Sequence, residues 1–384
     1  MKILRVITRL NVGGPAIQAI DLSRELKKKG HEIRLIAGRT PKHEGLKLEL
    51  KAFNELDVYD TEIAFVPSLK REINLKMDWK VFKNLRRDIK EFKPDILHTH
   101  MSKAGLVGRF AALSILKKNR PKIVHTFHGH VFHSYFGKIK TYVIKKIEAF
   151  LAKRSNAIIA ISEKQRSDLI EIGVPPEKIH VVMLGFDLEP FLKIKEKEYD
   201  PEHLDVGFVG RLAPIKNIDF LVKLVISLKR VFPSVTLHVA GSGEEKELEK
   251  LEGLGDSVIF YGWLDREKMP GFYEKMDLIV CTSKNEGTPV SLIEAMASSR
   301  LVASTMVGGI VDLLPTRGII LIDNFDLPGV NTVDAKVLRF VMGYKAVRLD
   351  YINNAREFVK KNYRLERLVM EIERLYEVLI KGEK

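Results

Sequence analysis

The amino-acid sequence predicts an α/β protein made of two tandem doubly wound, Rossmann-like domains. Short apolar segments alternate with helical ones through the first part of the chain, and the same rhythm starts again after residue 200. Apolar strands separated by helices favour a parallel sheet that is covered on both faces. The length of 384 residues exceeds that of one ordinary α/β domain and suits two.

The first domain is predicted over residues 1–188. Its expected strands are the buried-type runs 2–8, 32–37, 62–66, 95–99, 122–127 and 156–161. Helical patterns lie between these runs, for example from Pro15 to Lys29 and from Ser102 to Leu116. A proline at a helix start and a glycine after its last residue, here Gly30, are typical of helix ends.

The second domain is predicted over residues 189–363. Its expected strands are 206–209, 235–240, 258–260, 278–281, 301–303 and 319–322. Residues 189–203 are highly charged, which is typical of an exposed linker. From about Val333 onward the pattern predicts helices only, and the last of them is amphipathic.

Composition narrows the function classes. The net charge of +14 favours nucleic acid, anionic lipid or phosphorylated ligands, or it reflects a lysine-rich surface. No basic and aromatic strand pattern of an RNA platform occurs, so we expect no nucleic-acid partner. The single cysteine, Cys281, excludes an internal disulfide and favours a reducing cytoplasm, and we expect it to be a buried core residue. The sequence shows neither a signal peptide nor a transmembrane run.

The sharpest motif runs from Glu286 to Ala297 and reads EGTPVSLIEAMA. It follows a strand and opens a helix, for which Thr288 is the expected N-cap and Pro289 the expected first residue. The free N–H groups of a helix start favour an anion. Nearby carboxylates, here Glu286 and Glu294, would accept hydrogen bonds from hydroxyls, as on a sugar or a ribose. The alternative is a polar loop before an ordinary amphipathic helix.

Two further loops follow predicted strands. The segment 207–217 places Arg211 and Lys216 after Gly210, where two cations would bracket a diphosphate, although loop cations are commonly only solvated. Gly13 and Gly14 let the backbone approach a ligand before the first helix. The chain contains no Gly-x-Gly-x-x-Gly and no Gly-Lys-Ser/Thr loop, so dinucleotide or P-loop functions are poorly supported.

A histidine-rich segment ends a strand of the first domain. Within it, Thr126-Phe127-His128-Gly129-His130, preceded by His125 and followed by His133, places the His128 ring where a ligand would bind. Zinc binding is the alternative, but cysteine and carboxylate partners at ligand spacing are absent nearby. The chain also lacks an Asp-x-Asp pair of the kind that holds a divalent cation on a diphosphate, so we expect no metal and no other cofactor.

Together these motifs, in this order and spacing, resemble the family-4 retaining glycosyltransferases of the GT-B fold, which include bacterial and archaeal enzymes of surface polysaccharide or glycolipid synthesis. The resemblance covers essentially the whole chain. It implies a donor-binding second domain and an acceptor-side first domain onto which the final helix, residues 364–384, crosses back. Thr288 stands where many relatives carry Phe or Leu, and Leu184-Gly185-Phe186-Asp187 replaces their common Asn-Gly-x-Asp.

The resemblance also implies roles for individual residues. Arg211 and Lys216 would hold the diphosphate, Glu294 the ribose hydroxyls, and Glu286 and His128 the donor sugar, while Gly13 and Gly14 would lie near the phosphate and the acceptor. The implied catalytic residues are His128, Arg211, Lys216 and Glu286, and the implied donor-binding residues are Gly13, Gly14, Gly210, Arg211, Lys216, Gly287, Thr288, Pro289, Val290 and Glu294.

The expected function is therefore retaining, metal-independent transfer of a hexose from a nucleotide-diphosphate sugar, with UDP favoured, to a glycan or lipid-linked acceptor. Retention is expected through same-face attack rather than double displacement. The alternatives are a sugar phosphorylase, a UDP-sugar epimerase, or a non-catalytic nucleotide-sugar-binding protein. Residues 137–154 form a basic, partly apolar helix that would rest on an anionic membrane or simply expose lysines to solvent. The expected location is the cytoplasm, with a peripheral position on the inner face of the membrane as an option.

Overall fold

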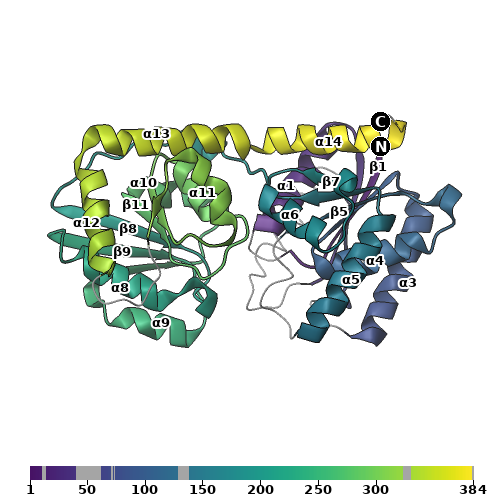
Figure 1. Cartoon of the computed structure of the whole chain (residues 1–384), viewed down its shortest axis with the longest axis horizontal. Coiled ribbons are helices and arrows are strands. Elements are labelled where there is room, and N and C mark those ends of the chain that lie inside the picture. Colours follow the sequence, from purple (N-terminus) through teal and green to yellow (C-terminus); the bar gives the residue numbers. More distant parts are fainter. Residues whose placement is uncertain are drawn as a thin grey trace. The chain divides into compact units, whose positions relative to one another are not determined.

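The structure is a computed structural model, and its description covers residues 1–10, 14–39, 62–70, 72, 74–128, 138–322 and 330–382. The chain divides into two units (Figure 1). The first contains Met1–Phe186 together with Leu365–Lys384, and the second contains Asp187–Arg364. Each unit holds one parallel sheet with helices on its faces, so the predicted fold class is confirmed.

The first unit contains a seven-stranded sheet of order β3-β2-β1-β4-β5-β6-β7, and every pairing is parallel. Its strands are β1 (Lys2–Ile7), β2 (Glu32–Ala37), β3 (Glu62–Phe65), β4 (Ile96–His100), β5 (Lys122–Thr126), β6 (Ala157–Ala160) and β7 (Ile179–Val181). The sequence analysis found all of these strands except β7. That strand reads Ile179-His180-Val181, and the histidine in its middle interrupts the apolar run that would have predicted it.

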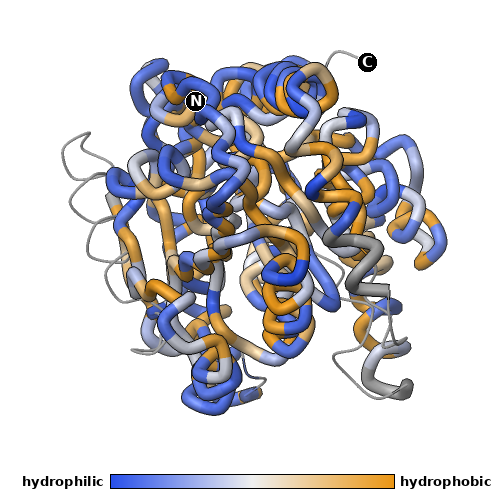
Figure 2. The backbone as a smooth tube through the Cα atoms, turned by 90° about the vertical axis from the view of Figure 1, so that its left-hand side faces the viewer, coloured by the Kyte–Doolittle hydropathy of each residue, from blue (hydrophilic) through white to orange (hydrophobic). Residues whose placement is uncertain are grey.

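Helices cover both faces of this first sheet (Figure 1). They are α1 (Gly14–Lys28), α3 (Leu75–Phe92), α4 (Ser102–Leu113), α5 (Lys138–Arg154), α6 (Glu163–Glu171) and α14 (Leu365–Lys381). Residues of α3 and α4 pack on one face, and residues of α1 and α14 pack on the other. The last helix therefore belongs to the first unit, as expected, because its apolar stripe is buried there. Apolar and polar residues alternate along the helices of the chain (Figure 2).

The second unit contains a six-stranded parallel sheet of order β10-β9-β8-β11-β12-β13. Its strands are β8 (His203–Val209), β9 (Ser234–Ala240), β10 (Val258–Gly262), β11 (Leu278–Cys281), β12 (Leu301–Ser304) and β13 (Ile320–Leu321). Its helices are α7 (Glu189–Leu192), α8 (Ile218–Leu228), α9 (Glu245–Glu252), α10 (Met269–Lys275), α11 (Val290–Ala297), α12 (Val330–Gly343) and α13 (Lys345–Asn362). Its core joins the strands to α8, α9, α12 and α13.

The strand order fixes where each unit can bind a ligand. In both sheets the first strand lies in the middle, β1 between β2 and β4, and β8 between β9 and β11. The chain reverses its direction of winding at these strands, and ligands of such sheets bind outside the carboxyl ends there. Gly14 begins the helix that follows β1, and the loops after β8 and β11 carry Arg211 and Glu286.

Most side chains of residues 189–203 are exposed, as predicted for this segment, but the segment is not exposed throughout. The segment begins with α7, and the side chains of Phe191 and Ile194 are buried, being 1% and 8% exposed. Two arginines hold its backbone: Arg356 donates hydrogen bonds to the carbonyl oxygens of Leu192 and Ile194, and Arg300 donates to that of Lys195. The charged composition of the segment did not predict these buried side chains and bonded carbonyl oxygens. Charge content alone does not show which side chains are buried or where backbone carbonyls point.

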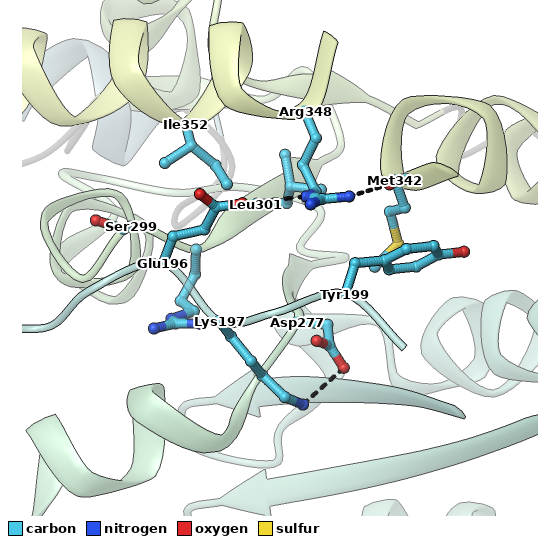
Figure 3. Close-up of a pocket in the computed structure, with 10 residues that line it drawn as sticks. Glu196, Lys197, Tyr199, Asp277, Ser299, Leu301, Met342, Arg348 and Ile352 are labelled. Carbon is cyan, nitrogen blue, oxygen red and sulfur yellow. Dashed lines mark hydrogen bonds and ion pairs between the residues drawn. The ribbon is translucent and has the colours of Figure 1, made fainter. Parts of the chain in front are cut away.

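This segment also lines the pocket drawn in Figure 3. Lys197 lies there beside Asp277, with its Nζ atom 2.9 Å from the carboxylate, and Arg348 donates to the carbonyl oxygen of Met342 at 2.6 Å. Asp277 and Leu301 stand at the amino ends of β11 and β12, the sheet edge opposite to the predicted site. We therefore assign these ion pairs to the structure of the second unit rather than to ligand binding.

None of the helices in the described ranges combines the length and the apolarity that crossing a membrane requires.

Candidate functional site

An ion pair joins two of the predicted site residues. Lys216 ends a short helical turn after β8, Glu286 lies in the loop after β11, and the Nζ and Oε1 atoms are 2.6 Å apart. Burial alone would lower the pKa of Lys216, but the neighbouring Glu286 carboxylate outweighs it, so the lysine pKa is raised. Lys216 is therefore a cation at neutral pH and is held in a fixed place.

Side chains at the end of β11 hold this pair in position. The Ser283 hydroxyl donates to Glu286 Oε1 at 2.5 Å, and the Cys281 thiol lies 3.5 Å from the same oxygen. The Thr282 hydroxyl donates to the carbonyl oxygen of Lys216 at 2.9 Å. Burial and the Glu286 carboxylate raise the pKa of Cys281, so this buried residue is a thiol and also a neighbour of the site.

A second cation stands next to this pair. Arg211 is exposed, follows Gly210 directly, and its charge acts on Lys216 by lowering the lysine pKa slightly against the effect of Glu286. Gly210 has a φ angle of +150°, and a Cβ atom added there would lie 3.4 Å from the Lys216 side chain. The second unit therefore gathers Gly210, Arg211, Lys216 and Glu286 at the carboxyl ends of β8 and β11.

Glu294 lies inside α11 and is buried, with 7% of its surface exposed. The Tyr273 hydroxyl donates to its Oε2 atom at 3.0 Å. Burial raises the pKa of Glu294 to about 7, against the opposing influence of the Arg266 charge and the Tyr273 hydrogen bond. A ligand hydroxyl that donates a hydrogen bond to this carboxylate would stabilise its charged form and so lower its pKa.

The predicted start of α11 is wrong by one residue. Pro289, not Thr288, is the N-cap, Val290 is the first helical residue, and no side chain caps the helix. The Thr288 carbonyl oxygen accepts a hydrogen bond from the N–H of Val290 at 3.0 Å, which closes a tight turn ahead of the helix. Backbone geometry therefore replaces the side-chain cap that the residue type predicted. Gly287 and Thr288 are half-buried in this turn, directly after Glu286.

Two glycines that the sequence analysis missed hold the Glu286 loop in place. The N–H of Gly309 donates to the carbonyl oxygen of Glu286 at 3.0 Å. A Cβ atom on Gly308 would lie 2.1 Å from that oxygen, and one on Gly309 would lie 1.9 Å from the carbonyl oxygen of Gly287. Only glycine permits such close approach of two backbones. The signal was available, because this Gly-Gly pair follows β12 just as Gly13 and Gly14 follow β1.

Gly241 and Gly243 play the same part beside Arg211. A Cβ atom on Gly241 would lie 1.9 Å from the carbonyl oxygen of Gly210, and one on Gly243 would lie 1.8 Å from that of Leu212. The N–H of Leu212 donates a hydrogen bond to the carbonyl oxygen of Ser242 at 3.0 Å, between the same two loops. The loop after β9 therefore packs backbone to backbone against the loop that carries Arg211.

The remaining predicted residues belong to the first unit. Gly14 is the first residue of α1, and His128 follows β5 with its Nε2 atom 2.9 Å from Nδ1 of His100. Burial and the charge of Arg5 lower the pKa of His128 to about 3, so its ring is neutral. Gly13 lies outside the described residues, as do Gly129, His130 and His133 of the histidine segment.

The sequence analysis named His125 but missed three other buried residues of this cluster, His98, His100 and Arg5. His98 and His100 point from β4, His125 from β5, and Arg5 from β1. Burial lowers the pKa of all three histidines, and the Arg5 or Arg109 charge lowers it further. The alternation His98-Thr99-His100 at the end of a buried strand was the signal that could have found them. Across the described residues, no three His, Cys, Asp or Glu side chains gather in a way that could hold a metal ion.

Comparison with known proteins identifies the family. Residues 12–190 match the family model described as Glycosyltransferase Family 4, and residues 203–330 match the one described as Glycosyl transferases group 1. The chain belongs to the family-4 glycosyltransferases. It is therefore an enzyme of the transferase class.

Two curated relatives show where the similarity lies. The UDP-Gal:α-D-GlcNAc-diphosphoundecaprenol α-1,3-galactosyltransferase of Escherichia coli is 32% identical over 250 residues, which make up 61% of this chain and 63% of the relative. The chain thus matches somewhat less than two thirds of that enzyme's length. An uncharacterized glycosyltransferase of Methanocaldococcus jannaschii is 25% identical over 96% of both chains.

Solved structures agree on the fold. That of Anabaena Alr3699/HepE in complex with UDP superposes with a TM-score of 0.73 at 19% identity, over 98% of this chain and all of that one. Sucrose-phosphate synthase from Thermosynechococcus elongatus gives a TM-score of 0.77 at 18% identity over 100% of both chains. Both have the two Rossmann-like domains of the GT-B fold.

The glycine contact behind Glu286 leads to a first prediction. Replacing Gly309 by alanine places a Cβ atom 1.9 Å from Gly287 oxygen, so the Glu286 loop must move. We expect a loss of about 1–3 kcal/mol in the free energy of unfolding, as for other overpacked sites, together with weaker transferase activity. The matched control is Gly271→Ala in α10, where an added Cβ meets nothing within 4 Å. Equal urea midpoints for the two variants would show that the close approach of Gly309 to Gly287 does not contribute to stability.

Proposed function

We propose that this glycosyltransferase moves a hexose from a UDP-sugar, with retention of configuration and without a metal ion. The observation that carries the proposal is the cluster of Arg211, Lys216 and Glu286 at the switch point of the second sheet. Two cations beside one another suit a diphosphate, whose negative charge grows as the glycosyl bond breaks. Cations fixed before the reaction stabilise that charge most in the transition state.

The choice of UDP draws on the relatives. The Escherichia coli relative is named for UDP-Gal, and solved structures of the Anabaena protein contain UDP or UDP-glucose. In this chain, Glu294 lies one turn inside α11, the helix that follows the Glu286 loop, and we assign the ribose of the donor to it. Its buried carboxylate would accept hydrogen bonds from both ribose hydroxyls, as carboxylate oxygens can.

The ion pair suggests how a donor would enter. A diphosphate that binds Lys216 replaces Glu286 as the partner of the ammonium group. The Glu286 carboxylate is then released to accept a hydrogen bond from a hydroxyl of the hexose, while Ser283 continues to hold its position. One pair of charges thus keeps both residues in place before the donor arrives, and each then takes a different part of it.

For retention we propose attack on the same face from which the diphosphate leaves. The glycosyl–oxygen bond to UDP breaks, the acceptor hydroxyl forms the new bond, and a donor phosphate oxygen takes the hydroxyl proton. A double displacement would need a carboxylate nucleophile beside the sugar. Within the described part of the chain, the hydrogen bond found for the His128 ring goes to His100 rather than to a carboxylate. Arg211 and Lys216 supply the positive charge for which other transferases use a metal ion.

The proposal predicts which ligands stabilise the protein and which residue transfer requires. UDP and one UDP-hexose should raise the melting temperature more than GDP or ADP, because a ligand at about 100 times its dissociation constant adds roughly 2.7 kcal/mol. Lys216→Ala should abolish this shift and lower turnover about 10²–10³-fold, the usual effect of removing one preorganised donor of this kind. Turnover is measured as UDP released with short glycan and lipid-linked acceptors.

The control for this experiment is Lys284→Ala, which removes an exposed lysine from the same loop as Glu286. It should leave the thermal shift and the turnover unchanged. Excess EDTA should not slow the reaction, and proton NMR should find the anomeric configuration of the donor in the product. Near-normal turnover of Lys216→Ala would remove the lysine from this role. Dependence on inorganic phosphate would favour a phosphorylase, and a change of sugar without an acceptor would favour an epimerase.

The buried Glu294 predicts a pH dependence of UDP binding. Its pKa is about 7 in the free protein, and ribose hydroxyls that donate to the carboxylate lower it, so binding releases a proton near neutral pH. Affinity should therefore fall as pH drops below about 7, by at most about tenfold per pH unit. Isothermal titration between pH 6.5 and 8 checks this above the phosphate pKa of about 6. In Glu294→Gln the dependence should be flat, and equal slopes in both proteins would rule out this role.

The acceptor is proposed to be a glycan or a lipid-linked sugar, which the name of the Escherichia coli relative supports. We further propose that α5 brings the enzyme to an anionic membrane. Tyr142, Val143 and Phe150 are exposed on this basic helix, at 62%, 47% and 43%, and Phe150 contacts Phe110 of α4. Apolar and cationic side chains on one helix suit the headgroup region of a bilayer. The cytoplasmic location stays a prediction.

A liposome experiment tests this contact. The protein should sediment with vesicles that contain anionic lipid and remain in solution with neutral ones. Replacing Tyr142 and Val143 together by serine should weaken sedimentation severalfold, because both side chains are exposed and apolar. The control is Trp79→Ser on α3 of the same unit, another exposed aromatic residue with a lysine beside it. Equal sedimentation of both variants, or none with either lipid, would favour an ordinary solvated helix.

A further inference from the structure

A buried row of nitrogen atoms crosses three neighbouring strands of the first unit. It begins at Arg5 of β1, passes His100 of β4, and ends at His128 after β5. The Arg5 guanidinium lies 3.0 Å from Nε2 of His100. Nδ1 of His100 lies 2.9 Å from Nε2 of His128. Arg5 and His100 are completely buried, so water does not replace these contacts.

The chemistry of Arg5 decides where the protons in this row are. A guanidinium has only donors, so Nε2 of His100 must accept. A neutral His100 then carries its proton on Nδ1 and donates it to Nε2 of His128. Burial keeps both rings neutral, because it lowers both pKa values and the Arg5 charge lowers them further. His128 must therefore carry its own proton on Nδ1.

We propose that Arg5 and His100 are positioning residues that fix His128 in its Nδ1–H tautomer, so that Nδ1 donates to an oxygen of the transferred sugar. This inference rests on the proposed function. Nδ1 of His128 is a buried polar atom for which the described residues provide no hydrogen-bond partner. A buried N–H without a partner is unfavourable, so a hydrogen bond from Nδ1 to a ligand oxygen would stabilise the complex.

A neutral donor suits this reaction better than an imidazolium ion. Positive charge develops on the sugar as its bond to the diphosphate breaks, and a charged ring beside it would repel that charge. Arg5 acts on His128 only through His100. Its guanidinium is held in place by hydrogen bonds that it donates to the carbonyl oxygen of Ala19 at 2.6 Å and to the hydroxyl of Ser23 at 2.7 Å. It therefore sets the tautomer through His100 without itself approaching the sugar.

The same cluster contains a natural control. His98 lies two residues from His100 on β4, but its ring nitrogens contact the hydroxyls of Tyr376 and Thr126, at 2.5 and 2.7 Å, and not His128. A purely structural role would make both histidines equally important for activity. A directing role requires only the partners along the row from Arg5 to His128.

The tautomer is measured on the full-length wild-type protein by long-range ¹H–¹⁵N correlation NMR with ¹⁵N-histidine. The His128 signal is assigned by its loss in His128→Asn. We expect a protonated Nδ1 and an unprotonated Nε2 in His128. A protonated Nε2, or an imidazolium at pH 7, would overturn the proposal without any variant having to fold.

Kinetics of three variants supply the second test. His100→Phe should populate both His128 tautomers and lower kcat about tenfold, which corresponds to roughly 1.4 kcal/mol. UDP binding should be unchanged, because UDP lacks the sugar. His100→Asn places an amide N–H near the position of Nδ1 and should restore the tautomer and most of kcat. Tyr376→Phe disturbs only the His98 branch and should keep wild-type kcat.

The outcomes separate this inference from the proposed function. A normal tautomer and normal kcat in His100→Phe would contradict the positioning role alone. Equal losses of kcat in His100→Phe and Tyr376→Phe would assign the cluster to folding and likewise overturn the role. Failure of the wild-type protein to transfer any sugar would contradict the proposed function, while the NMR measurement would still decide the tautomer of His128.

Discussion

The contact between Lys216 and Glu286 keeps together two loops that are 70 residues apart in the chain. Each loop starts at the carboxyl end of a central strand, β8 or β11, so the sheet brings their first residues close. The sheet does not decide where the side chains point. The ion pair, with Ser283 and Thr282 bonded to its two halves, fixes that direction. The remaining features of the donor site are arranged around this fixed pair.

Backbone contacts rather than side chains support the two loops from behind. Gly308 and Gly309 press against Glu286 and Gly287, and Gly241 presses against Gly210. Such contacts leave no room for a Cβ atom, so they are stiff and cannot be loosened by rotating a side chain. Preorganisation of this kind is what an electrostatic site needs, because its cations act only if they do not have to move when charge develops.

The sequence predicted the parts of this protein that depend on local patterns. Short apolar runs located the strands, and the Glu286–Glu294 spacing located the helix and its loop. The strand β7 was missed because His180 interrupts its short apolar run. The N-cap at Pro289 escaped because a turn closed by the Thr288 carbonyl replaced the expected side-chain cap. The residue type shows that a side chain could cap a helix, but it does not show whether a backbone turn takes the place of that cap.

The buried network of the first unit could not be predicted for a different reason. Arg5, His98 and His100 come from strands that read as apolar core, and a polar residue there becomes meaningful only when its neighbours across the sheet are known. A guanidinium buried among neutral imidazoles is unfavourable unless hydrogen bonds satisfy it. Here Ala19, Ser23 and His100 accept bonds from the two terminal nitrogens of Arg5, while its Nε has no partner among the described residues. A core built only for stability gains nothing from such a charge, whereas a core that must orient one ring gains a fixed direction for its proton.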